Sequence, residues 1–277
     1  MKKHASVILL VLMLVIGMSL ILYPTLANWW NSFHQSRAVA NYDAVLADMK
    51  EEDYSRLFDE AMEYNRQIQE LKFPLMYYDQ VPGYYDLLDI TGTGIMGYID
   101  IPVIDVELAI YHGTSEGVLQ AGVGHVQGTS LPTGGEGTHC VLSAHRGLPS
   151  ARLFTDLDKV QVGDVFTLTV IDRVLTYEVD QILTVLPHEV EALYTVAGED
   201  YCTLVTCTPY GINSHRMLVR GTRIENANAV SVRRVTADAV QIAPILVAPM
   251  VAAPILLVLL IVLLLPKKKT VRRYDLP

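Results

Sequence analysis

The feature that most constrains this chain is a pair of uncharged apolar runs, one near each end. Residues 5–23 form the first run, behind Lys2 and Lys3, and residues 239–266 form the second, ahead of five basic residues. Each run is long enough for a helix to cross a hydrocarbon core of about 30 Å. Because basic residues favour the cytoplasmic side of a membrane, both termini are predicted to be cytoplasmic. The stretch between the runs is then extracellular.

The first run has a second interpretation, a cleaved signal peptide. Residues 25–27 read TLA, which resembles a small-residue cleavage site. The apolar core is long for a signal peptide, and this favours a retained anchor.

The formal net charge of −9 conceals an asymmetry between the ends and the middle of the chain. Seven basic residues and one acidic residue lie in the terminal segments, and removing them leaves −15 for the remainder. Nucleic-acid binding needs clustered Lys and Arg, so no nucleic-acid partner is expected. An acidic domain could instead attract basic partners or lysine-bearing substrates.

Hydrophobic periodicity divides the extracellular part into a helical and a β region. Residues 28–71 carry apolar side chains at three-to-four-residue intervals and are predicted to be helical. After a Pro- and Gly-rich loop, short β-branched runs follow from residue 95 to residue 224, with short helices expected at 115–120 and 151–157. One hairpin is expected to turn at Asp172-Arg173. This pattern predicts a mainly β sandwich or barrel.

The three cysteines leave several chemistries open. Cys140, Cys202 and Cys207 are an odd number, so at least one thiol is free. Cys202 and Cys207 share one predicted strand, about 16 Å apart, which is too far for a disulfide. Spacing does not exclude a bridge from Cys140 to either one. A zinc site from His139, Cys140, His145 and Cys207 is a weaker alternative, because no C-x-x-C or H-x-x-x-H spacing supports it.

Cys207 and Arg216 flank a short connection rich in Pro, Gly and Asn. Adjacent antiparallel strands would bring them together. A cysteine attacks only as its thiolate and needs a basic neighbour, usually histidine. His145 ends a strand and enters a Gly/Pro loop, where a side chain stays accessible, so it ranks first, and His215 second. Arg216 could donate to a developing oxyanion, although a surface salt bridge is the commoner role of arginine.

Three stretches together resemble the sortases, and most closely the class C, pilus-assembling sortases. They are TLVTCTPYGINSHRMLVRG at 203–221, THCVLSAHRGLPSARLFTDL at 138–157 and GIMGYIDIP at 94–102. The resemblance covers about residues 92–224 and extends weakly into the helical region. A membrane anchor at the C-terminal end is usual in that class, and this matches the second apolar run.

The resemblance implies a fold and a reaction. The fold is a closed eight-stranded sortase β-barrel with short helices, an N-terminal helical appendage and a transmembrane helix at each end. Cys207 would be the nucleophile, His145 the acid/base and Arg216 the oxyanion or substrate-positioning residue, with Thr206 and Thr208 as substrate-binding or oxyanion support. The substrates would be pilins or surface proteins with LPxTG-like signals, cut between Thr and Gly through a thioester. A lysine of another pilin would resolve the thioester and form an isopeptide bond. No metal or organic cofactor is implied.

Two features depart from the class C pattern. Class C members usually carry a lid with an Asp-Pro-aromatic motif, and no Asp-Pro occurs here. Phe73, Pro74, Tyr77 and Tyr78 occupy the corresponding region and could form a lid in its place. Second, LPTGG at 131–135 resembles a sorting signal superficially, but it lies over a hundred residues before the C-terminal run. We interpret it as a turn.

The sequence is thus divided into six parts. They are the anchor or signal at 1–27, helices and possible lid loop at 28–91, the catalytic barrel at 92–226, a linker at 227–238, the C-terminal transmembrane helix at 239–266 and a basic cytoplasmic tail at 267–277.

The nearest alternative function is a sortase that attaches surface proteins to cell-wall peptidoglycan. A papain-type protease would place its histidine after the cysteine, the reverse of the order here. A non-catalytic membrane-anchored adhesion module would have no reactive thiol.

Overall fold

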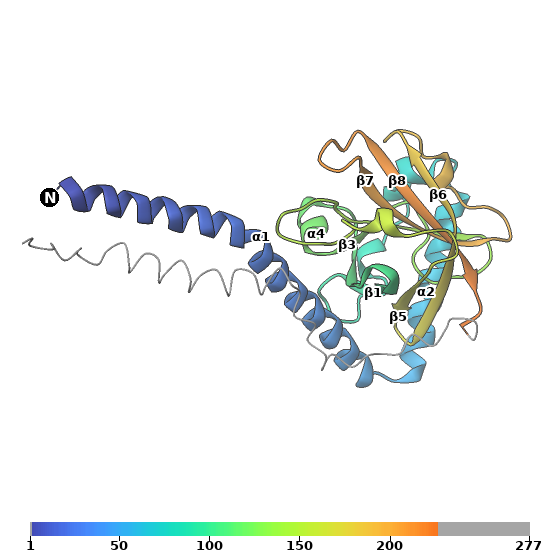
Figure 1. Cartoon of the computed structure of the whole chain (residues 1–277). Helices are drawn as coiled ribbons and strands as arrows, with labels where there is room; N and C mark the ends of the chain where they lie inside the picture. The colour runs from blue at the N-terminus through green and yellow to red at the C-terminus, as the bar shows by residue number, and fades with distance from the viewer. Residues whose placement is uncertain (1, 227–277) are drawn as a thin grey trace, which may run out of the picture. The chain divides into compact units, whose positions relative to one another are not determined.

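The computed structural model describes residues 2–226, and within them eight strands close into a barrel (Figure 1). The order around the barrel is β1-β2-β3-β4-β7-β8-β6-β5. The predicted closed eight-stranded barrel is therefore confirmed. The strands are β1 Ile95–Ile101, β2 Val106–His112, β3 Val123–His125, β4 Thr138–Ser143, β5 Val165–Val170, β6 Arg173–Val185, β7 Asp200–Thr208 and β8 His215–Ile224.

Strand β7 lies between a parallel neighbour, β4, and an antiparallel neighbour, β8. β4 pairs with β7 in parallel, ending at Ser143 opposite Val205. β8 pairs with β7 antiparallel, as the second strand of a hairpin. The C-terminal ends of β4 and β7 and the start of β8 therefore meet at the same end of the barrel.

Alternation along these strands separates an inner from an outer face. Cys202 and Leu204 of β7 and Leu142 of β4 belong to the main buried cluster that fills the barrel. The intervening Val141 and Val205 join a second, smaller cluster with Leu218 of β8, packed against residues of β6 and of the β6–β7 connection. Odd-numbered residues of β4 and β7 thus face outward.

Two helices precede the barrel, α1 Lys2–Ala47 and α2 Glu51–Glu70. The helical prediction for 28–71 is correct in type, and the chain breaks between the two helices at residues 48–50. The hydroxyl of Tyr54 donates to the Leu46 carbonyl at 2.7 Å. It thereby links α2 to the last turn of α1, at a carbonyl that also accepts from Met49 N at 3.1 Å.

The part of α1 after Leu26 packs on the barrel. Tyr42 is fully buried, and its hydroxyl donates to Met96 O at 2.9 Å and accepts from Ile171 N at 2.7 Å. Gln35 accepts from Ala109 N at 3.1 Å, and its amide nitrogen contacts Ala121 O. This segment is therefore a structural part of the barrel unit, which begins at Leu26.

The N-terminal part of α1 has the length and composition of a membrane span. Among the described residues, one helical segment, Met13–Ala47, passes this test, and its apolar window of 18 residues has mean hydropathy 1.3 and is not buried inside the molecule. A membrane-anchoring helix near the N-terminus is thus supported. The expected linker, second span and basic tail, residues 227–277, lie outside the described residues.

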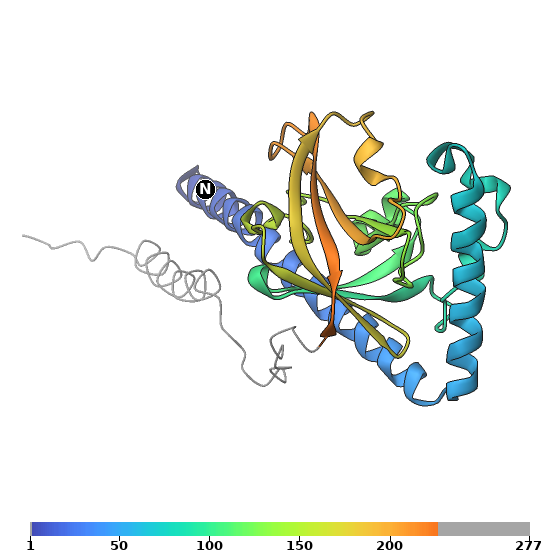
Figure 2. The ribbon, with the colours of Figure 1, turned by 90° about the vertical axis from the view of Figure 1, so that its right-hand side faces the viewer.

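Helix α2 lies along one side of the barrel (Figure 2) and holds the connection between β3 and β4. Asn65, which is buried, accepts from Leu131 N at 2.7 Å and donates to Leu131 O at 3.2 Å. Leu131 is fully buried. The first three residues of the LPTGG stretch are buried, which supports its interpretation as a connection within the barrel and not an accessible sorting signal.

The remaining elements include one confirmed and two inaccurate predictions. The short helix expected at 115–120 is α4 Glu116–Ala121. The hairpin turns one residue earlier than expected, because Val170 pairs with Arg173. The expected helix at 151–157 is wrong. Leu153 has φ +40°, and Phe154 N donates to His145 O and not to a carbonyl four residues earlier. The other short elements are α3 Pro74–Tyr77, η1 Tyr78–Gln80, η2 Tyr84–Asp86, η3 Pro102–Ile104, η4 Leu157–Lys159 and η5 Glu191–Leu193.

Candidate active site

Cys207 and Arg216 are directly opposite each other at the end of the β7–β8 hairpin. Directly opposed residues of an antiparallel pair project to the same face of the sheet. Cys207 follows Val205 by two residues on β7, so this is the outer face. The thiol of Cys207 is partly exposed and free. The sequence prediction that the hairpin brings these two residues together is therefore confirmed.

His145 approaches the same place from β4. The β4–β7 ladder extends one bond past β4, from Ala144 N to Val205 O at 3.2 Å. Ser143 is paired with Val205. Two residues further along each of these parallel segments are His145 and Cys207. β7 is the middle strand, so Cys207 lies between His145 on one side and Arg216 on the other. The three predicted residues meet at one end of the barrel.

The imidazole of His145 is held in a partly enclosed position. Its Nε2 atom is buried and has no hydrogen-bond partner among the described residues. Oε1 of Glu116, at the start of α4, lies 3.8 Å away, and the side chain of His145 is 28% exposed against 72% for Glu116. An unpaired ring nitrogen at this place is available for proton transfer to a bound substrate.

The guanidinium of Arg216 is oriented by its own hairpin. Its Nη1 donates to the carbonyls of His215 and Asn213 at 3.0 and 3.2 Å. Arg216 is half-buried, and the described ion pairs do not include it. Among residues 2–226, Arg216 therefore lacks the surface salt bridge considered from sequence. Nη2 and Nε remain as donors that could reach an oxyanion.

The two threonines beside Cys207 both bond to residues next to His145. Thr206 is buried, and its hydroxyl donates to Ala144 O at 2.9 Å. It thus ties β7 to the residue before His145 from inside the barrel. The hydroxyl of Thr208 accepts from Nη1 of Arg146 at 3.2 Å. That contact had no signal in the sequence, where Arg146 is one of several arginines.

The other two cysteines lie inside the barrel. Cys140 and Cys202 are register partners on β4 and β7, both are free, and both are almost completely buried. Burial raises the pKa of the Cys202 thiol well above its usual value. Cys140 faces inward and Cys207 outward. A zinc site that joined Cys140 with Cys207 would need ligands from opposite faces of the sheet, so this alternative loses support.

Three other histidines have structural partners. His139 is buried, with Nε2 2.7 Å from Thr203 Oγ1 and Nδ1 3.0 Å from Tyr194 O, and burial lowers its pKa. His125 lies within 2.8 Å of the Tyr84 hydroxyl, and burial lowers the pKa of His112. His215, ranked second from sequence, precedes Arg216 on β8 and so points to the other face.

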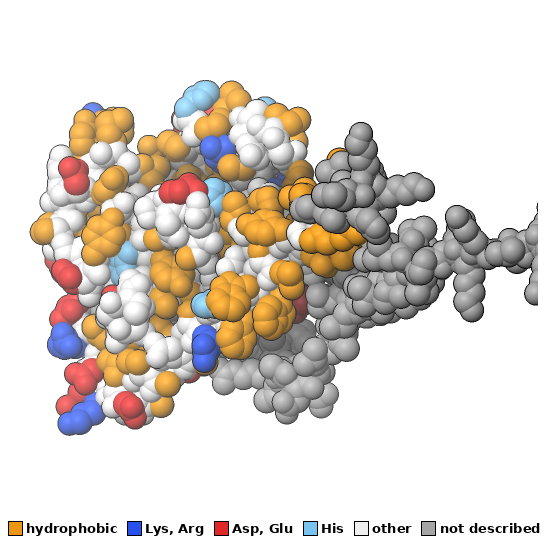
Figure 3. Space-filling view, turned by 90° about the vertical axis from the view of Figure 1, so that its left-hand side faces the viewer, with side chains coloured by type: hydrophobic (Ala, Val, Ile, Leu, Met, Phe, Trp, Pro, Cys, Tyr) orange, Lys and Arg blue, Asp and Glu red, His pale blue; other side chains and the backbone are white. Residues whose placement is uncertain are grey.

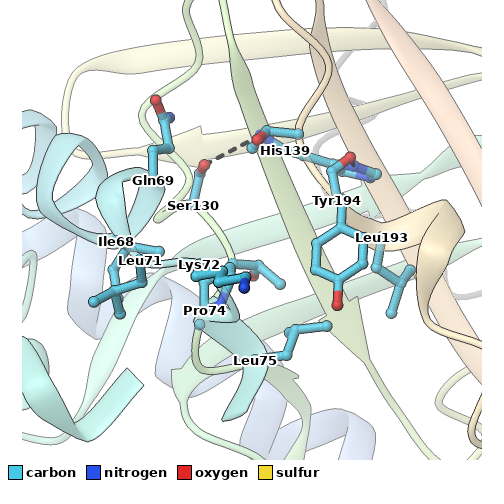
Figure 4. A pocket seen from close by; sticks show the side chains of 13 residues that line it. Ile68, Gln69, Leu71, Lys72, Pro74, Leu75, Ser130, His139, Leu193 and Tyr194 are labelled. Carbon is cyan, nitrogen blue, oxygen red and sulfur yellow. Dashed lines mark hydrogen bonds between the residues drawn. The ribbon is translucent and has the colours of Figure 1, made fainter. Parts of the chain in front are cut away.

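A pocket of about 130 Å³ lies next to His139 on the outer face. One wall is the end of α2 and α3, including Lys72, Pro74 and Leu75, and the opposite wall is the β6–β7 connection with Leu193 and Tyr194. The Tyr194 side chain points toward Leu75 (Figure 4). Pro74 O also packs against Gly128, whose φ of +86° and missing side chain allow this close approach.

The predicted lid residues lie in and beside this wall. Phe73 and Tyr77 are 44% and 43% exposed, and their rings contact each other at 6.5 Å between centroids. Tyr78 packs against the main core.

On the face drawn in Figure 3, Lys and Arg side chains stand apart and form no continuous basic patch, whereas hydrophobic side chains are widespread.

Comparisons with known proteins identify the family. The sortase domain family matches residues 99–224. Sortase A of Streptococcus agalactiae serotype III is 32% identical over 117 residues, which are 41% of this chain and 47% of that protein. Sortase D of Bacillus subtilis is 30% identical over 131 residues, 46% of this chain and 63% of that protein. The chain spans about half the length of the curated relatives it matches.

Solved structures extend the match beyond the barrel. Sortase C1 from Streptococcus agalactiae is 50% identical with a TM-score of 0.65, over 69% of this chain and 99% of that one. Sortase C from Streptococcus pneumoniae is 44% identical with a TM-score of 0.62, over 68% and 97% of the two chains. The chain belongs to the sortase family, and its structural neighbours are class C sortases.

Proposed function

We propose that this protein is a class C sortase, a cysteine transpeptidase that joins pilin subunits. The observation that carries the proposal is the register of the barrel end. Cys207 and Arg216 are direct partners on the outer face, and His145 enters beside them from the parallel strand. A nucleophile, an acid/base and a cationic donor converging on one point are the parts that acyl transfer needs.

The reaction proceeds in two acyl transfers. The Cys207 thiolate attacks the threonine carbonyl of the sorting signal, and Arg216 donates to the resulting oxyanion. Collapse breaks the Thr–Gly bond, and His145 gives its proton to the departing glycine amine, leaving a thioester. A neutral lysine amine then attacks the thioester, His145 accepts its proton, and the Cys207 thiolate leaves. The product is an isopeptide bond.

The pocket beside His139 supports a sorting signal as the substrate. His139 bonds Thr203, which faces the same side of β7 as Cys207 and is about 13 Å away along the strand. In an extended LPxTG segment, leucine lies three residues, about 10 Å, before the threonine. A signal whose threonine carbonyl is at Cys207 and which runs along β7 therefore places its leucine near the pocket.

The structural neighbours favour pilins as substrates. The chain spans 97% of the pneumococcal sortase C structure, whose description concerns pilin substrate specificity. The membrane topology belongs to the proposal as well. The N-terminal helix and residues 239–266 both cross the membrane, the barrel is extracellular, and both termini are cytoplasmic.

A lid belongs to the proposal too. Lys72, Pro74 and Leu75 line the pocket that the leucine of the signal would enter. A segment in this position competes with the substrate, so the signal binds when the segment moves. Phe73 and Tyr77, exposed on the same segment, are the residues whose packing would hold it closed.

The test uses the full chain in detergent or nanodiscs. A pilin with an LPxTG signal and its lysine-substituted variants are incubated with the protein, and products are mapped by mass spectrometry. We expect pilin–pilin isopeptide bonds that need both the signal and one acceptor lysine. Cys207→Ala should form neither thioester nor product. Products in Cys207→Ala would refute the nucleophile, and transfer only to peptidoglycan amines would favour the cell-wall alternative.

A further inference from the structure

The side chain of Arg146, the residue after His145, joins the two halves of the site. It is only 8% exposed. Its guanidinium uses all three nitrogens. Nη1 donates to Thr208 Oγ1 at 3.2 Å, Nε to Thr155 O at 3.2 Å, and Nη2 to Asp158 Oδ2 at 2.5 Å. One of these partners lies on β7, immediately after Cys207, and the other two lie on the loop that follows His145.

This contact begins where the strand ladder ends. The last register pair of β4 and β7 is Ser143 with Val205, followed by one bond from Ala144 to Val205. His145 and Cys207 come after these pairs, so the ladder itself does not fix their separation. The Arg146–Thr208 bond joins the two chain segments again, one residue beyond His145 and Cys207. The two reacting residues therefore lie between the last bond of the ladder and this bond.

We call the contacts of Arg146 with Thr208, Thr155 and Asp158 the Arg146 clamp. Further hydrogen bonds hold its loop side in place. Thr155, whose carbonyl accepts from Arg146, accepts through its hydroxyl from Gly147 N at 3.1 Å. Phe154 N donates to His145 O at 3.1 Å. Gly147 has φ +78°, and a side chain there would meet the ring of Tyr210 from the β7–β8 connection. The first turn of the loop is therefore pressed against the strand connection that carries Cys207 and Arg216.

The chemistry of arginine suits this role better than that of any other side chain. A buried cation needs a charge partner and hydrogen-bond acceptors, and Asp158 and two neutral oxygens supply one partner for each guanidinium nitrogen. The rigid planar fork donates in three directions at once. A lysine ammonium can keep the ion pair with Asp158, but as a point charge on a flexible stem it cannot hold the same three partners in fixed directions.

We propose that Arg146 is a positioning residue that sets the distance and angle between His145 and Cys207. Each nitrogen of its guanidinium bonds to the protein, to Thr208, Thr155 or Asp158, so we assign it no contact with the substrate. The inference rests on the proposed transpeptidase function for its kinetic consequence. Small displacements of reacting groups have large effects on rate, with about 1 Å costing about 100-fold.

The experiment compares Arg146→Lys with Arg152→Lys in the full-length protein. Arg152 belongs to the same loop and pairs with Asp156 at 2.6 Å, so it is a matched control that leaves the clamp intact. We expect Arg146→Lys to lower kcat by roughly 10- to 100-fold with KM changed less than two-fold, and to alter the pH profile of the rate. Arg152→Lys should keep the wild-type kcat and profile. An equal loss in both variants, or no loss in Arg146→Lys, would overturn the proposal.

A second pair of variants protects the test against misfolding. Thr208→Val removes the hydroxyl that Arg146 reaches, and Thr208→Ser keeps it. We expect a several-fold lower kcat for the valine variant, rescue by serine, and little further loss when Thr208→Val is added to Arg146→Lys, since the two changes break one contact. Independent, additive losses would show that Thr208 does not act through Arg146.

Alkylation of Cys207 separates this inference from the proposed function, because it needs no sorting signal. The rate of reaction with iodoacetamide is measured against pH in the wild type and in Arg146→Lys. If the wild type fails to turn over any LPxTG substrate but the variant shifts the alkylation profile, the transpeptidase proposal fails and the positioning role stands. Superimposable profiles would refute the positioning role, whatever the substrate proves to be.

Discussion

The two sides of the active site are built in different ways. On one side, Cys207 and Arg216 belong to a single hairpin, whose strands pair continuously from Tyr201 with Thr222 to Thr208 with His215. On the other side, His145 opens an irregular loop that is held by contacts from distant parts of the chain. Local pairing fixes the first half, and tertiary contacts fix the second.

Two of the distant contacts come from helix α1. Asn31 donates to Ser150 O at 2.7 Å, and Asn28 accepts from Arg152 N at 2.8 Å, across 119 and 124 residues of sequence. Such side-chain contacts at the surface open more easily than a strand ladder. Changes far from the chemistry should consequently disturb His145 and leave Cys207 and Arg216 in place. The following predictions test this difference, from the largest expected effect to the smallest.

Removing the imidazole should have the largest effect on the His145 side. His145→Ala is expected to lower kcat by roughly 10²- to 10⁴-fold, the usual contribution of a general acid/base. The wild-type rate should follow a bell-shaped pH profile that depends on both Cys207 and His145, and the variant should lose that shape. Steady-state kinetics between pH 5 and 10 provide the measurement. A variant that keeps both rate and profile would remove His145 from the mechanism.

On the hairpin side, Arg216→Lys tests the role of the guanidinium. We expect kcat to fall by about 100-fold, the cost of losing one oxyanion donor, with KM almost unchanged. The hairpin places Arg216 directly opposite the nucleophile, and this favours action on the transition state over ground-state binding. Kinetics with an LPxTG peptide decide between them, since a raised KM with wild-type kcat would assign Arg216 to substrate binding. Arg220→Lys is the matched control, because Arg220 lies four residues further along β8 and is paired with Asp180.

The same difference explains what the sequence could predict. The β7–β8 hairpin follows from two apolar runs around a Pro/Gly/Asn connection, so the proximity of Cys207 and Arg216 was accessible from local pattern alone. Residues 151–157 have a helix-like composition, but tertiary contacts determine their conformation. Phe154 bonds to His145, and Arg146 binds Thr155 and Asp158. No periodicity encodes such contacts, and the clamp could not be predicted for the same reason.

The helical region shows the same limit on a larger scale. Its apolar spacing predicted helices correctly, but it indicated neither the break at residues 48–50 nor the partners of the buried polar residues. Tyr42 bonds Met96 and Ile171, and Asn65 bonds Leu131. These side chains read as ordinary members of an amphipathic pattern until the barrel is present to receive them.

An intermediate effect is expected for the lid. Phe73→Ala or Tyr77→Ala removes a ring that is more than half buried, a loss of about 1 kcal/mol. Labelling of Cys207 by a methanethiosulfonate should therefore accelerate roughly five-fold, because the open form gains population. Met76→Ala, on the same short helix and 68% exposed, should leave the rate unchanged. Cys140 and Cys202 are too buried to react. If deletion of residues 72–85 also leaves the labelling rate unchanged, this protein has no lid.

The smallest effect is expected from α1, and it is the sharpest test of the difference between the two halves. Asn31→Ala removes one hydrogen bond to the His145 loop, worth about 1 kcal/mol, so kcat should fall about 2- to 5-fold. The exposure of Cys207 depends on the hairpin, so its labelling rate should not change. Ser32→Ala is the control, because Ser32 is the next residue and its hydroxyl bonds only within the helix, to Asn28 O. Hydrogen exchange should show faster exchange at residues 147–155 in the Asn31 variant and unchanged exchange in β7 and β8. Equal acceleration in the hairpin would mean that the two halves open together and that the helix supports the whole site.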